Sequence, residues 1–150
     1  MGLRGDSEIV LDAKGRISIP AAYRDELSES CSGDLVVTKH PVDPCLVLHP
    51  LPVWEKIEDK LVAASSHDAA SRRMVRNVIG RAVTVSMDKS NRILLPSGMR
   101  EAANLNSTVW LIGIGNKFEI WSDTQWSGNY GAFTDEELNE IPDEIKDLVM

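Results

Sequence analysis

A ten-residue pattern occurs twice in this chain, and it constrains the fold more than any other feature. Residues 11–20 read LDAKGRISIP and residues 87–96 read MDKSNRILLP. Repetition of this kind indicates a duplicated structural unit, so we expect two tandem copies of one fold within the 150 residues. The coinciding residues are Asp12 and Asp88, Arg16 and Arg92, Ile17 and Ile93, and Pro20 and Pro96, and four residues beyond the pattern Arg24 coincides with Arg100.

Each copy is predicted to contain a tight turn built around its aspartate. The short carboxylate of Asp12 can accept hydrogen bonds from backbone amides two residues further on, and Gly15 supplies the positive φ that closes the turn. In the second copy Asp88 takes the same place, and Asn91 replaces the glycine. Asparagine visits the left-handed region readily, so both sequences satisfy one geometry.

The rest of each copy reads as strands with one short helix, so the fold class is mainly β with short helices (α+β). The apolar strand after each turn ends in proline, Pro20 or Pro96, and we expect that proline at the first position of a helix. Further strands are predicted at residues 8–11, 35–38, 45–48, 109–112 and 117–121.

Two helices are predicted between the copies, and the chain divides accordingly. Val53, Trp54, Ile57, Leu61 and Ala64 form an apolar stripe on the first helix, and the second spans about residues 68–79. The predicted units are residues 1–52, a helical linker at 53–80, a second copy at 81–126 and an acidic tail at 127–150.

The net charge of −7 argues at first against DNA binding, but the acids are unevenly placed. Seven of the 23 acidic residues and only one base, Lys146, lie in residues 135–150. The remaining body is nearly neutral, so the global charge says little about any local surface.

Several other classes of function find no support in the sequence. The start lacks the apolar run of a signal peptide, and no stretch approaches the length of a membrane span. We therefore expect a cytoplasmic protein with reduced cysteines. Neither catalytic motifs nor metal-ligand spacings occur, so we expect no enzyme activity, cofactor, metal or small-molecule substrate. The residues weighed for metal binding are Cys31, Cys45, His40, His49 and His67.

The two turns resemble those of the MraZ family, a likeness that extends to Arg4-Gly5 and to residues 45–54 and 116–121. The resemblance implies two AbrB-like halves that exchange hairpins to form a pseudo-dimeric β-barrel, with copies assembling into rings. It also implies a nucleoid-associated transcriptional regulator that binds direct repeats upstream of the division and cell-wall gene cluster. It implicates the Asp-x-x-x-Arg turns in contacting double-stranded DNA, through the first turn, the second or both. The candidate contact residues are Arg16 and Arg92, together with Lys14 and Lys89 at the turn tips, and the residues that form the turns are Asp12, Gly15, Asp88 and Asn91.

Three alternatives compete with this interpretation. Arg16 and Arg92 can each brace their own turn and do nothing else. The acidic tail, or the helix bearing Arg72, Arg73 and Arg76, can serve an oligomeric structural or partner-binding protein, as in antitoxins of AbrB-like fold. A hydrolase with Asp12 and Asp88 as paired carboxylates is the third, but the adjacent arginines would keep both acids ionised.

Overall fold

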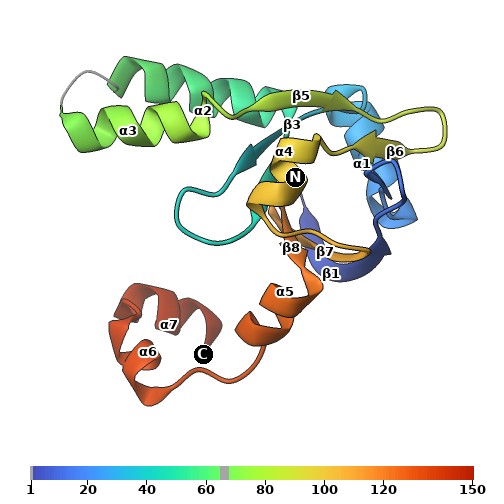
Figure 1. The fold of residues 1–150 in the computed structure, drawn as a ribbon. Helices are drawn as coiled ribbons and strands as arrows, with labels where there is room; N and C mark the ends of the chain where they lie inside the picture. Colours follow the sequence, from blue (N-terminus) through green and yellow to red (C-terminus); the bar gives the residue numbers. More distant parts are fainter. Residues whose placement is uncertain (1, 65–67) are drawn as a thin grey trace.

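The computed structural model describes residues 2–64 and 68–150, and the two halves of the chain contain corresponding elements in the same order (Figure 1). The first half consists of β1 (Leu3–Val10), β2 (Arg16–Ser18), α1 (Ala21–Cys31), β3 (Asp34–Lys39), β4 (Leu46–Pro50) and α2 (Leu51–Ala64). The second consists of β5 (Val83–Ser86), β6 (Arg92–Leu94), α4 (Ser97–Ala102), β7 (Thr108–Gly115), β8 (Phe118–Ser122) and α5 (Asp123–Asn129). Helix α3 (Ala69–Val78) joins the halves, and α6 (Asp135–Glu140) and α7 (Asp143–Val149) end the chain. The predicted fold class is confirmed.

The two halves exchange their first strands. A six-stranded antiparallel sheet has the order β1-β7-β8-β4-β3-β5, so β1 pairs with β7 of the other half and β5 pairs with β3. Strands β2 and β6, also from different halves, form a separate antiparallel ribbon. This is the pseudo-dimeric exchange of hairpins that the resemblance implies. Among the described residues β1 and β5 remain the ends of an open sheet, so a closed barrel is not shown.

Apolar side chains from both halves fill one core. Ile17 and Ile93 on the ribbon pack above the sheet residues Leu111, Phe118 and Ile120, and all five are fully buried. Burying a side chain of this size stabilises the fold by roughly 1.5–3 kcal/mol. Because β2 and β6 contribute equally to the core, neither half can bury its apolar face without the other.

Two predictions of element boundaries are wrong. Pro20 and Pro96 precede the helices as caps, with ψ near 144° and 146°, and helical residues begin at Ala21 and Ser97. Each proline keeps an extended backbone while its carbonyl accepts the first helical hydrogen bond. Strand β1 begins at Leu3 instead of residue 8, because it pairs with β7 over its whole length.

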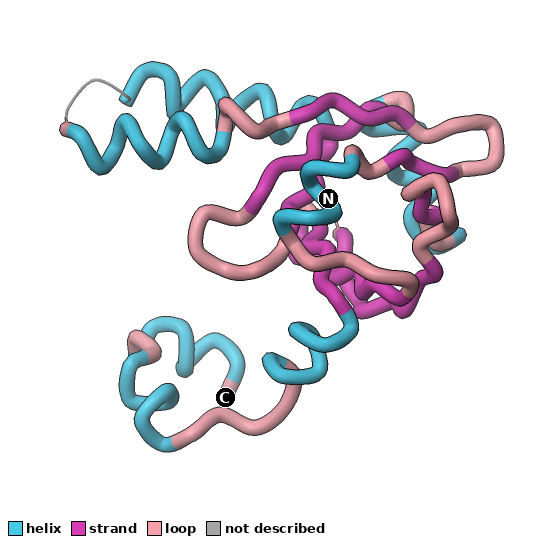
Figure 2. Tube along the Cα trace, viewed as in Figure 1, coloured by secondary structure: helices cyan, strands magenta, loops and turns pink. Residues whose placement is uncertain are grey.

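Helices α2 and α3 lie side by side, whereas α6 and α7 form a separate group at the C-terminal end (Figures 1 and 2). Helix α2 places Trp54 against the sheet beside His49, with ring centroids 5.6 Å apart, and α3 runs alongside α2. Trp126 of α5 packs against Trp110 and Trp121. These tryptophans therefore serve packing. Helices α6 and α7 stand apart from the sheet and contribute no buried residue.

Candidate nucleic-acid interface

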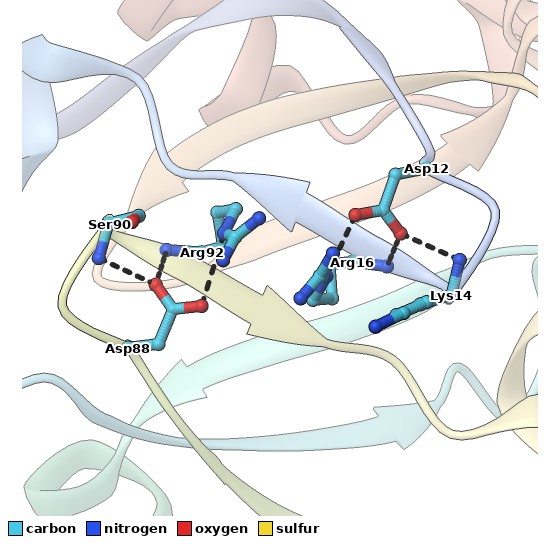
Figure 3. A network of polar contacts seen from close by, with 6 residues as sticks. All are labelled: Asp12, Lys14, Arg16, Asp88, Ser90 and Arg92. Carbon is cyan, nitrogen blue, oxygen red and sulfur yellow. Dashed lines mark hydrogen bonds and ion pairs between the residues drawn. The ribbon is translucent and has the colours of Figure 1, made fainter.

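The two aspartate turns lie at opposite ends of the β2–β6 ribbon (Figure 3). In its register Ile17 faces Ile93, and the pairs on either side are Arg16 with Leu94 and Ser18 with Arg92. Directly paired residues project to the same side of a ribbon, and the next residues project to the other side. Since Ile17 and Ile93 point into the core, both arginines project outward.

In the first turn a single carboxylate organises the backbone. One oxygen of Asp12 accepts hydrogen bonds from the amides of Lys14 and Arg16, both at 2.9 Å, and the other accepts from Arg16 Nε at 2.8 Å. Gly15 closes the turn with φ 87°. These bonds, above all that from the Arg16 amide, lower the pKa of Asp12 to about 2, so the carboxylate is ionised at neutral pH.

The second turn repeats the same contacts with different residues. One oxygen of Asp88 accepts from the amides of Ser90 and Arg92, at 2.8 and 2.9 Å, and the other accepts from Arg92 Nε at 3.1 Å. Asn91 adopts φ 59° where the first turn has glycine. The amide of Arg92 is again the main cause of a lowered pKa, here that of Asp88.

Each turn is also held by the opposite half of the chain. The carbonyl of Gly15 accepts from the amide of Leu95, and the carbonyl of Asn91 accepts from the amide of Ile19, both at 2.9 Å. Arg24 and Arg100, which recur in the repeat, donate from Nε to the carbonyls of Ile19 and Leu95. This second pair of arginines therefore holds the ends of the two apolar segments that follow the turns.

The bracing of Arg16 and Arg92 leaves both available to a ligand. Each uses Nε for its own aspartate, and within the described residues the terminal nitrogens of either guanidinium make no hydrogen bond. Lys14 and Lys89 are exposed beside them. With one aspartate, one arginine and one lysine, each turn carries a net positive charge, in spite of the acidic chain.

The outward face of the ribbon contains two further residues, which are not among those predicted from the sequence. Leu94 lies opposite Arg16 and Ser18 lies opposite Arg92, and Leu94 is 54% exposed. The alternation of inward Ile17 and Ile19 with Ser18, and of Ile93 and Leu95 with Leu94, was the signal that could have identified them. The face therefore offers an apolar contact as well as two guanidinium groups.

Two groupings of ionisable residues within residues 2–64 and 68–150 bear on the alternatives of a hydrolase and a metal site. Asp12 and Asp88 lie in separate turns with their own arginines (Figure 3), which does not fit a carboxylate pair sharing a proton. His40, Asp43 and Glu119 place possible ligand atoms within 4.8 Å of one another. However, His40 Nδ1 already accepts hydrogen bonds from the amides of Val42 and Asp43, so only Nε2, which faces Asp43, is left for a metal ion. His67 lies outside the described residues, and no described helix could cross a membrane.

Comparison with known proteins agrees with the duplicated architecture. The model of the MraZ protein family, whose description likens it to antitoxins, matches twice, at residues 3–77 and 78–147. The chain belongs to the MraZ family. Among its MraZ relatives, proteins of Pseudomonas putida F1 and Pseudomonas aeruginosa LESB58 are each 42% identical to it and carry the name transcriptional regulator MraZ. Both alignments cover 98% of this chain and 99% of the relative.

Proposed function

We propose that this MraZ-family chain is a transcriptional regulator that binds double-stranded DNA through the outward face of the β2–β6 ribbon. The observation that carries the proposal is the placement of Arg16 and Arg92 on that face, with Lys14 and Lys89 at its two ends. The major groove, about 12 Å wide, admits a two-stranded β-ribbon. Arginine can bind guanine or phosphate with two nitrogens at once.

The spacing of the arginines suits bases about two steps apart, because successive bases along a strand are separated by about 3.4 Å. Arg16 and Arg92 are diagonal neighbours across the ribbon, which corresponds to about 7–8 Å between their backbones. The hydrogen bond from Nε to aspartate fixes how each guanidinium enters the groove, while its outer nitrogens remain free to donate. Leu94 can contact a thymine methyl group, and the turn lysines can bind phosphates.

We further propose that several copies assemble into a ring and bind direct repeats upstream of the division and cell-wall gene cluster. One ribbon offers few contacts, so a single copy binds one repeat weakly. Linked copies bind further repeats at a high effective concentration. A cytoplasmic, nucleoid-associated protein is the corresponding expectation for its location.

The test is fluorescence anisotropy with a duplex carrying the direct repeats upstream of the organism's own copy of this gene. A scrambled duplex and a duplex with one repeat serve as controls. We expect preference for the full repeats and weak binding to one repeat. The logarithm of the binding constant should fall with the logarithm of the salt concentration, with a slope of about 0.9 per phosphate contacted. Equal binding to the scrambled duplex at low salt would overturn the proposal.

The competing function is an oligomeric, antitoxin-like protein that binds a partner and has no specific DNA site. The observation in its favour is the C-terminal segment, whose helices α6 and α7 carry seven acids and no buried residue. This alternative predicts that the ribbon arginines only hold their turns, so their replacement would change stability and leave DNA binding unaffected.

A further inference from the structure

An apolar groove lies between α2 and α3. Figure 1 shows these two helices at a distance from β6 and its turn. It has a volume of about 320 Å³ and is lined by Leu61 and Ala64 of α2 and by Ala70, Ser71, Met74 and Val75 of α3. Met74 is 42% exposed although it lies on the apolar side of the helix. Helix α3 contributes no buried residue at all, so its apolar side is only partly covered by α2.

The polar side of α3 is strongly basic. The helix contains Arg72, Arg73 and Arg76 and no acidic residue. All three arginines are exposed, and within residues 2–64 and 68–150 none forms an ion pair. The Asp68 carboxylate caps the helix by accepting from the amide and hydroxyl of Ser71. None of these arginines lines the groove, so α3 has an apolar side at the groove and a separate, strongly positive side.

The C-terminal segment, residues 135–150, has the opposite charge and an apolar row of its own. Its seven acids accompany four apolar residues, Leu138 on α6, Ile141 between the two helices, and Ile145 and Leu148 on α7. Ile145 and Leu148 are 51% and 81% exposed. A complete capping box at Thr134 and Glu137 starts α6, so part of the segment is already helical before it meets a partner.

We propose that the groove between α2 and α3 binds the C-terminal segment of a second copy of this chain. Short amphipathic helices commonly bind by placing their apolar residues into such a groove. Helix α3 and the segment with α6 and α7 also carry charges of opposite sign, arginines on α3 and carboxylates on the segment. Figure 1 shows α6 and α7 standing clear of α2 and α3 in the same chain, which leaves the groove open to a neighbour.

This inference rests on the proposed assembly of several copies and says which surfaces join them. Exposed ion pairs contribute little individually. The apolar contacts therefore supply most of the affinity, while the charges orient the segment and speed its association. The ribbon β2–β6 takes no part in this contact, so it stays free for DNA.

Disulfide trapping between two single-cysteine variants of the full chain tests the contact. Met74→Cys is mixed with Leu148→Cys, the two chains differing in tag mass, under mild oxidation. We expect a covalent heterodimer from this pair. The matched control, Glu29→Cys on the exposed side of α1 mixed with Leu148→Cys, should give none. The native Cys31 and Cys45 are both buried. Oxidation of each single variant by itself measures any disulfide that these native cysteines form.

Two results would overturn the inference. In the Met74→Cys/Leu148→Cys double variant, a disulfide confined to one chain would place the segment on its own groove. Absence of any specific disulfide would exclude the contact altogether. Native mass and DNA anisotropy of the same samples separate the two proposals. Intact oligomers that prefer the repeats but do not cross-link refute the groove alone, whereas monomers without DNA preference refute both proposals.

Charge reversal gives an independent measurement on the same pair of surfaces. Replacing Arg72, Arg73 and Arg76 with glutamate should slow formation of the heterodimer about tenfold, the equivalent of about 1.4 kcal/mol. Replacement of the same three residues with lysine should leave its rate near that of the parent. An unchanged rate in the glutamate variant would show that the basic helix does not face the acidic segment.

Discussion

The carbonyl oxygen of Gly15 accepts a hydrogen bond from the amide of Leu95, 80 positions along the chain and in the other half of the repeat. Asn91 and Ile19 make the reciprocal bond at the other end of the ribbon. Each turn is thus shaped by its own aspartate and fixed in position by the opposite copy. The duplicated halves therefore act as one unit in presenting Arg16 and Arg92.

Gly15 should tolerate substitution less well than its counterpart Asn91. A Cβ atom at Gly15 would lie 2.6 Å from Cζ of Arg100, so even asparagine, which accepts the positive φ, must displace that side chain. We expect Gly15→Asn to lower the free energy of unfolding by about 1–3 kcal/mol, as overpacking does. Asn91→Gly should change it by less than about 1 kcal/mol. Urea denaturation of both variants measures this, and equal effects would contradict the role of Arg100.

Lys14 should contribute to DNA affinity without contributing to sequence preference. It is exposed at the tip of the first turn, and only its backbone is held by Asp12. If its ammonium group binds phosphate, Lys14→Ala should weaken binding to the repeat duplex and the scrambled duplex alike. It should also reduce the slope of log affinity against log salt concentration by about 1 per bound copy. Anisotropy over a range of salt concentrations checks this. A loss confined to the repeat duplex would show that Lys14 reads bases.

Asp12 should make the fold sensitive to acid. Its pKa falls from 3.8 to about 2 in the folded chain, so the unfolded chain binds the proton more tightly. Its contribution to stability is complete above about pH 5 and is lost as the pH falls through 4 towards 2. Between pH 5 and pH 2 the melting temperature should fall more steeply in the wild type than in Asp12→Asn, because asparagine does not titrate. Parallel curves for the two proteins would contradict the depressed pKa.

His49 should produce a separate pH dependence at higher pH. Burial, aided by Lys117, lowers its pKa to about 4, and Nδ1 has no hydrogen-bond partner among the described residues. Because the unfolded chain takes up the proton near pH 6.5 and the folded chain does not, stability should fall between pH 6.5 and 4. His49→Phe keeps a ring beside Trp54 and cannot titrate. Its free energy of unfolding should lack this decline, whereas an identical decline would assign the effect to other groups.

The local structure of the turns followed from the residues themselves. Aspartate, a residue that tolerates positive φ, and an apolar strand ending in proline are short-range signals, and each acts within ten positions. The helix starts were misplaced by one residue because proline is acceptable both as a cap and at the first helical position. Sequence preference alone does not separate those two placements.

The arrangement of the strands depended on information that is not local. Nothing in residues 3–10 indicates that β1 pairs with β7 rather than with its own hairpin partner, because either pairing satisfies the same backbone groups. The exchange of strands between the two halves could be predicted only from the family resemblance. Likewise, Ser18 and Leu94 gain a place on the candidate site only when β2 and β6 lie side by side.

The most direct test of the ribbon as a DNA-binding surface is the affinity of arginine variants for the repeat duplex, measured by anisotropy at one fixed salt concentration. We predict that Arg16→Ala weakens binding by about 1–3 kcal/mol and loses preference over the scrambled duplex. Arg92→Ala should act in the same direction. Arg4→Ala, which removes an exposed arginine at the far end of β1, should bind as the wild type does. If Arg16→Ala, still folded and oligomeric, retains the affinity and preference of Arg4→Ala, the ribbon does not read DNA.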